Sequence, residues 1–64
     1  MKEIKIELKG IEIGQAMDLA MTRQDARLYK KRIYCGYYRM APLYATPEGF
    51  IVQIPDDEPE DYYK

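Results

Sequence analysis

Apolar and charged residues alternate at the start of the chain, over residues 2–9. The apolar side of this segment holds Ile4, Ile6 and Leu8. A period of two predicts a half-buried β-strand. After Gly10 the aliphatic positions shift by one residue, which leaves two interpretations open. Gly10 either marks a bulge that exchanges the faces of a longer strand or follows a strand that ends near Lys9, which we prefer.

A helical period begins at Ile13. Apolar residues recur at spacings of three and four, at Ile13, Ala16, Met17, Ala20 and Met21. This spacing predicts one face of an amphipathic helix, which we expect to pack on the apolar side of the first strand. Thr22 and Asp25 have the spacing of a capping box. They predict a second helix, or a kinked continuation of the first, that runs to about Lys31.

The next segment is rich in β-branched and aromatic residues. It predicts a strand from Arg32 to Met40, weakened in its middle by Gly36. Strict alternation places Ile33, Cys35 and Tyr37 opposite Tyr34, Tyr38 and Met40. Tyr37 and Tyr38 should therefore face opposite ways, with one of them exposed.

A hairpin is predicted beyond Pro42, which interrupts the preceding strand. Residues 43–45 and 50–54 are apolar except for Gln53, and they flank Thr46-Pro47-Glu48-Gly49. Proline at the second position and glycine at the fourth fit a type I turn. We expect Gly49 to adopt a positive φ, where a Cβ is costly.

The order of these elements predicts the fold class. A β-α-(α)-β-β-β order is typical of a small α+β domain, with a helix packed on a mostly antiparallel sheet. We assign residues 1–55 to this single domain. Residues 56–64 are acidic and contain too few apolar residues to bury, so we expect a mobile tail.

Charge is sorted along the chain, although the formal net charge of the 64 residues is only −1. Residues 22–46 carry six cations and one acid, which gives +5, and residues 47–64 carry six acids and one lysine, which gives −5. A basic patch is predicted at Arg23, Arg27, Lys30, Lys31 and Arg32. Fields of this kind govern steering and non-specific binding, so they indicate a charged partner.

Three interpretations of the acidic tail stay open. The tail can be an inert, solvated terminus. It can lie on the basic helix of its own chain or of a neighbouring copy. It can also present its carboxylates to a basic partner.

Seven of the eight aromatic residues are tyrosines. Tyrosine combines an apolar ring with a polar tip and is enriched at protein interfaces. It also suits the margin of a small core, the interpretation we favour for Tyr29 and Tyr44. The predicted partner-binding residues are Tyr34, Tyr37, Tyr38, Arg39, Tyr62 and Tyr63.

The composition argues against catalysis. Without His or Ser, the chain cannot form a Ser–His or Cys–His pair, and a Cys/His zinc site is excluded. Cys35 has no base to accept its proton, so it is expected to be a small structural hydrophobe. No two carboxylates are placed by the sequence to share a cleft. We expect no enzymatic activity, no cofactor and no metal.

These observations favour a small non-enzymatic regulator, adaptor or inhibitor that covers the surface of a protein partner with tyrosines and charge. The alternative is a nucleic-acid-binding protein, in which the cations of residues 23–39 contact phosphates and the rings stack on bases. A steep loss of binding with salt would distinguish the second from the first. A homodimer, with the basic face of one copy on the tail of the other, is compatible with the protein-interaction module.

The sequence also predicts a cytoplasmic location. A lone cysteine fits a reducing compartment. The charged, alternating start is unlike a signal peptide. No apolar run approaches the ~18 residues of a membrane span, so we expect no membrane partner.

Overall fold

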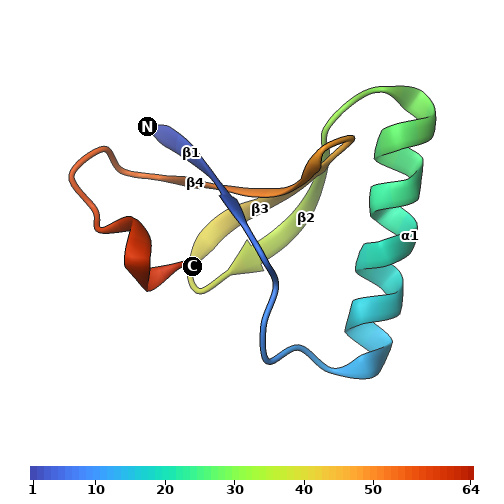
Figure 1. Cartoon of the computed structure of the whole chain (residues 1–64), viewed down its shortest axis with the longest axis horizontal. Helices are drawn as coiled ribbons and strands as arrows, with labels where there is room; N and C mark the ends of the chain where they lie inside the picture. Colours follow the sequence, from blue (N-terminus) through green and yellow to red (C-terminus); the bar gives the residue numbers. More distant parts are fainter.

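The computed structural model describes all residues from Met1 to Lys64. Its elements are β1 (Lys2–Ile6), α1 (Ile13–Tyr29), β2 (Ile33–Tyr38), β3 (Ala41–Thr46), β4 (Gly49–Ile54) and a 3₁₀ turn, η1 (Glu60–Tyr62). The four strands form one antiparallel sheet in the order β1-β4-β3-β2, and α1 packs on it against β2 and β3 (Figure 1). The predicted α+β class is confirmed.

The predicted hairpin is confirmed. Leu43 pairs with Val52, and Thr46 pairs with Gly49 across a two-residue loop. The Thr46 hydroxyl donates to the Gly49 carbonyl at 2.8 Å and accepts from the Glu48 amide at 3.3 Å, which fastens the turn. Gly49 has a φ of +144°, as expected for a glycine position.

The first strand is shorter than predicted. β1 ends at Ile6, so neither a strand to Lys9 nor a bulged longer strand forms. The reason is its partner: β4 begins at Gly49, and Phe50 already pairs with Ile6. Beyond Ile6 the chain has no strand beside it, and the half-buried Leu8 packs against the core from a loop.

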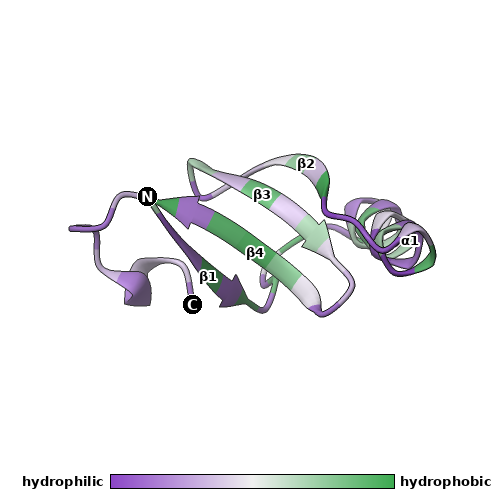
Figure 2. Cartoon of the chain, turned by 90° about the horizontal axis from the view of Figure 1, so that it is seen from above, coloured by the Kyte–Doolittle hydropathy of each residue, from purple (hydrophilic) through white to green (hydrophobic).

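The core lies on one face of the sheet and under the C-terminal segment. Its buried residues are Ile4, Ile6, Leu19, Tyr38, Ala41, Leu43, Val52, Ile54 and Tyr63. The domain measures 33 × 26 × 15 Å. Figures 1 and 2 show α1 at one end of its long axis and the C-terminal turn at the other.

The helix is continuous, so the predicted capping box at Thr22 is wrong. The Thr22 hydroxyl donates instead to the Asp18 carbonyl at 2.9 Å, four residues earlier in the same helix. This local bond satisfies the side chain without ending the helix. The helix ends at Tyr29, and the C-cap residue Lys30 adopts the left-handed conformation (φ 54°) that usually favours glycine. No helix of the chain is long and apolar enough to cross a membrane.

The predicted apolar face of the helix is also wrong. Leu19 and Ala26 are the buried residues of α1. Ile13, Met17 and Met21 point to solvent, and the Met17 side chain remains 63% exposed. The helix carries small and apolar residues on two sides. The fully buried Ala26 lies on the side that faces the sheet. Its single methyl group allows the helix backbone to approach the sheet closely.

A bulge in β2 changes the predicted alternation. Tyr34 pairs with Tyr44 and Tyr37 pairs with Pro42, and the register shifts between them. Gly36 takes a φ of +93° at this point. Because Pro42 and Tyr44 are two residues apart on β3, they share a face. Their partners Tyr34 and Tyr37 therefore lie on one face, not on opposite faces as predicted.

A tight turn joins β2 to β3 where a continuous strand to Met40 was predicted. Tyr38 pairs with Ala41, which leaves Arg39 and Met40 as the two turn residues. Both have positive φ, 50° and 69°. Two-residue hairpins need this geometry, usually with Asn or Gly, so the turn is strained.

Residues 56–64 contact the domain in the structure. Tyr63 is 3% exposed and belongs to the core, and its hydroxyl donates to Glu58. The Arg39 guanidinium donates to the Tyr62 carbonyl at 2.7 Å. The expectation that Tyr63 faces a partner beside Tyr62 is therefore corrected, because its ring fills the core. The mobility of the segment stays a prediction.

Candidate functional site

Three tyrosine rings gather on the sheet face that points away from the core. We call Tyr34, Tyr37 and Tyr44 the tyrosine platform. The centroid of the Tyr34 ring lies 6.4 Å from that of Tyr37 and 5.6 Å from that of Tyr44, both in edge-to-face geometry. Such pairs are worth ~0.5–1.5 kcal/mol beyond burial, so the rings hold one another in place. Tyr34 and Tyr37 are exposed, and Tyr44 is half-buried between its neighbours.

Strand pairing assembles the platform. Tyr44 stands in the central strand β3, and Tyr34 is directly opposite it on the edge strand β2. The bulge at Gly36 then returns Tyr37 to the same face, where its side chain is 68% exposed. Tyr38, the next residue, points into the core and is 8% exposed. The prediction that one member of this pair is exposed is confirmed.

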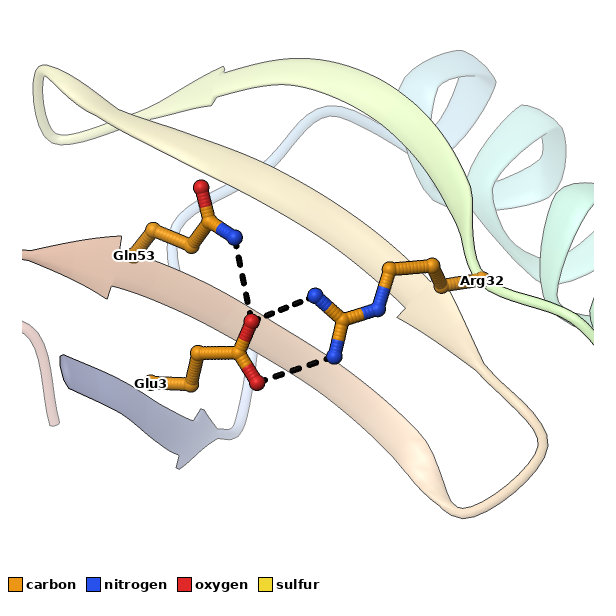
Figure 3. A network of polar contacts seen from close by, with 3 residues as sticks. All are labelled: Glu3, Arg32 and Gln53. Carbon is orange, nitrogen blue, oxygen red and sulfur yellow. Dashed lines mark hydrogen bonds and ion pairs between the residues drawn. The ribbon is translucent and has the colours of Figure 1, made fainter. Parts of the chain in front are cut away.

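A polar clamp crosses the same face. Arg32, just before β2, donates through both terminal nitrogens to the Glu3 carboxylate on β1, one of them at 2.9 Å (Figure 3). Gln53 on β4 donates to the same carboxylate at 3.0 Å. The Arg32 guanidinium also lies over the Tyr44 ring, 5.4 Å from its centroid. The clamp therefore links both edges of the sheet and touches the platform.

Contacts in the clamp and on the platform shift the pKa values of Glu3 and Tyr34. Hydrogen bonds from Arg32 and Gln53 lower the pKa of Glu3 to about 2. Desolvation, together with the Tyr37 hydroxyl, raises the pKa of Tyr34. The raised pKa keeps the Tyr34 phenol neutral near neutral pH, and the guanidinium that stacks on Tyr44 is paired with the Glu3 carboxylate. The face can offer apolar rings and hydroxyl groups, and the exposed Lys5, on the same face of β1 as Glu3, adds a positive charge.

The predicted partner-binding residues divide between two places. Tyr34 and Tyr37 stand on the platform. The other four surround the β2–β3 turn and the C-terminal segment: Tyr38, Arg39, Tyr62 and Tyr63. There the Arg39 guanidinium lies 5.3 Å from the centroid of the Tyr38 ring, and the Tyr62 ring meets Tyr63 edge to face at 5.0 Å. Tyr62 is the exposed tyrosine of this second group.

The basic residues predicted as one patch are spread over several surroundings. Arg32 is held in the clamp. Lys30 and Lys31 are exposed at the end of α1, with the Lys31 ammonium 5.8 Å from the centroid of the Tyr29 ring. Arg23 and Arg27 line a groove beside the helix. The tail does not lie on these cations, since its ion pairs go to the amino terminus, Lys2 and Lys64.

Cys35, on β2, is the one thiol of the chain. The half-buried Cys35 thiol donates to the Ile33 carbonyl at 3.2 Å. Burial raises its pKa, although the Ala45 backbone opposes this. A reactive thiolate needs the opposite shift. No group of three or more Cys, Asp or Glu side chains is placed to hold a metal ion.

Sequence reasoning missed Tyr44, Glu3 and Gln53. Tyr44 was interpreted as a core-margin residue, but pairing with Tyr34 makes it the centre of the platform. Gln53 is the one polar residue in the apolar segment of β4, and Glu3 lies directly opposite it on β1. A polar residue inside an apolar strand was the available signal, because it needs a partner on its face.

Comparison with family models, with curated proteins and with solved structures found no match for this chain.

Proposed function

We propose that this chain is a small non-enzymatic protein-interaction module, and that the tyrosine platform is its contact surface for a larger protein. It would act as a regulator, adaptor or inhibitor by covering a surface of that partner. The observation that carries the proposal is the edge-to-face cluster of Tyr34, Tyr37 and Tyr44 on the open face of the sheet. The half-buried Cys35 is the only cysteine, so we place the protein in the reducing cytoplasm.

The platform has the chemistry of an interface centre. Tyrosine and arginine are the residues most enriched among those that dominate binding energy. The rings are already fixed by mutual contact and by strand pairing, so ordering them on binding costs little entropy. An aromatic cluster left open on a sheet is an exposed apolar patch, and such patches mark interaction sites.

Protein binding is better supported than nucleic-acid binding, the second candidate. Exposed rings on an antiparallel sheet could stack on bases. Phosphate contacts would need free cations beside the rings, however, and Arg32 is occupied by Glu3. The exposed helix cations are distributed over the end of α1 and the groove instead.

A pull-down from host lysate tests the proposal, with and without nuclease. The double variant Tyr34→Ala with Tyr37→Ala should lose the partner, since each central tyrosine can contribute ~2 kcal/mol or more. Tyr29→Ala is the matched control, because Tyr29 is 63% exposed on α1 and outside the cluster. It should retain the partner.

Three outcomes separate the candidates. A partner that survives nuclease and disappears with the double variant supports the protein-interaction module. Loss of every partner with nuclease, and steep weakening by salt, supports nucleic-acid binding. Capture of the same proteins by the wild type and the double variant contradicts a role for the platform.

A further inference from the structure

A groove with apolar walls and two free guanidinium groups lies beside α1. Its volume is about 410 Å³. Leu8 and Ile11 from the loop, Leu19 from the helix and Phe50 from β4 contribute to its walls, and Arg23 and Arg27 to its polar side. We call this the arginine groove. It belongs neither to the platform nor to the clamp.

The two arginines of the groove lack an anion in the chain. None of the four ion pairs of the protein includes Arg23 or Arg27. The Nε atom of Arg23 is also buried without a hydrogen-bond partner. A buried donor left unpaired costs ~1–3 kcal/mol, more when it is charged. The groove is therefore suited to an occupant that brings a carboxylate next to an apolar group.

The C-terminal turn η1, at the other end of the molecule from α1, carries a carboxylate next to an aromatic ring. Asp61 and Tyr62 are exposed beside each other in η1, and Tyr62 is 54% exposed. Asp57 and Asp61 take part in no ion pair of the chain. The buried Tyr63 ring and the hydrogen bond from Arg39 to the Tyr62 carbonyl connect this segment to the domain. We call the segment with the exposed Asp61 and Tyr62 side chains the acidic knob.

We propose that the acidic knob of one copy docks in the arginine groove of a second copy. Asp61 would pair with the groove arginines, and the Tyr62 ring would cover the apolar wall. The two surfaces cannot meet within one chain, since α1 and the C-terminal turn lie at opposite ends of the long axis (Figures 1 and 2). The opposite, unpaired charges of the two ends favour a second copy as the occupant.

The geometry of this contact determines the kind of assembly. The groove and the knob are different surfaces, so the contact is head-to-tail. Each copy can insert its knob into one neighbour while its groove binds the knob of another. Repeated head-to-tail contacts form a ring or an open chain. The tyrosine platform stays free in either arrangement. An assembly would thus display several platforms, which raises avidity for a partner with more than one binding site.

Sedimentation velocity at low salt, over a concentration series, tests the inference. The wild type should form species larger than a monomer, and salt should weaken them. Arg27→Glu and Asp61→Lys should each weaken self-association roughly tenfold, because each places like charges together. Both residues are exposed and unpaired, so both variants should fold, which far-UV circular dichroism checks.

Charge exchange makes the test specific. The double variant with both Arg27→Glu and Asp61→Lys should associate again, because the exchanged charges attract. An equimolar mixture of the two single variants should associate too, since each can pair with the other. Lys31→Glu changes the net charge by the same amount as Arg27→Glu but lies outside the groove. This variant should associate as the wild type does. Tyr37→Ala should leave self-association unchanged, which separates this inference from the proposed function.

A wild type that stays monomeric up to its solubility limit at low salt would overturn the inference. So would failure of both the double variant and the mixture to recover association. Self-association that persists in Arg27→Glu and Asp61→Lys would assign the contact to another surface, such as the exposed Met17 side of α1, and would overturn it equally.

Discussion

Two neighbouring tyrosines of β2 have opposite surroundings. Tyr37 is 68% exposed on the platform, whereas Tyr38 is 8% exposed in the core. The C-terminal pair repeats the contrast, with Tyr62 exposed and Tyr63 buried. The chemical group is the same in all four cases. Strand register and the bulge at Gly36 decide the outcome for Tyr37 and Tyr38, and the C-terminal 3₁₀ turn decides it for Tyr62 and Tyr63.

Replacement of a buried tyrosine by alanine should lower stability far more than replacement of an exposed one, and this is the largest effect that we expect. Tyr63→Ala removes a ring from the core of a domain whose total stability is only ~3–5 kcal/mol, so it should leave the protein largely unfolded. Tyr37→Ala removes an exposed ring whose loss also breaks its edge-to-face contact with Tyr34, so it should lower stability by only ~0.5–1.5 kcal/mol. Urea denaturation followed by circular dichroism measures both. Equal effects of the two variants would contradict the division.

Gly36, in the bulge of β2, should be the next most sensitive position to substitution. Gly36 has a φ of +93°, and no atom lies within 4 Å of the place its Cβ would occupy. Gly36→Val should therefore cost ~1–2 kcal/mol through backbone strain alone. Loss of the bulge would also turn Tyr37 away from Tyr34.

Gly14→Ala is the matched control for this prediction. Gly14 is the second residue of α1, leaves the same open space for a Cβ and shows no positive φ. Its replacement should be neutral or stabilise the protein by up to ~0.5 kcal/mol. If Gly36→Val unfolds at the same urea concentration as the wild type, the bulge does not depend on glycine.

The two buried tyrosines should respond differently to loss of the hydroxyl. The Tyr38 hydroxyl is buried without a hydrogen-bond partner, so Tyr38→Phe should be neutral or stabilise by about 1 kcal/mol. The Tyr63 hydroxyl donates to Glu58, so Tyr63→Phe should destabilise. Thermal unfolding of the two variants compares them directly. A larger loss in Tyr38→Phe would show that its hydroxyl has a partner in solution.

Alkaline pH should act on Tyr63 in particular. The hydrogen bond to Glu58 raises the pKa of Tyr63 from its ordinary value of 10.0 to about 12. A pKa raised by folding stabilises the native state fully below the unfolded value, so this contribution should be lost as the pH rises from 10 to about 12. Tyr63→Phe should lack this part of the pH dependence. A wild type and variant with parallel stability curves above pH 10 would contradict it.

The clamp on the platform face should give the smallest effect, at acid pH. Folding lowers the pKa of Glu3 from 4.5 to about 2. Its contribution is therefore present above pH 4.5 and lost as the pH falls to about 2. Glu3→Gln should flatten this part of the stability curve only slightly, because exposed ion pairs contribute little. A large loss of stability in Glu3→Gln at neutral pH would show that the clamp supports the fold as a whole.

Local patterns in the sequence predicted the elements but not the contacts between them. The alternation before Gly10, the helical period from Ile13 and the Thr46–Gly49 turn each depend on nearby residues, and each element forms. The side of the helix that faces the sheet depends on distant packing. The helical period predicted the side of Ile13, Met17 and Met21, whereas Leu19 and Ala26 are the buried residues of α1.

The candidate site was harder to predict for the same reason. One extra residue at the bulge moved Tyr37 onto the face of Tyr34, a change that strict alternation cannot anticipate. Tyr44 joined them only through strand pairing. Tyr63 looked isolated in an acidic segment, yet the fold brings its ring to the core. Each of these outcomes depends on residues far apart in the sequence.

Site-specific photocrosslinking in host cells tests the central claim most directly. A benzophenone amino acid at position 37 should crosslink to one defined protein, whereas the same group at position 29 should not, although both side chains are well exposed. The Tyr34→Ala background should abolish the crosslink from position 37. Crosslinks from position 29 but none from position 37, or crosslinks from position 37 to nucleic acid, would contradict the account.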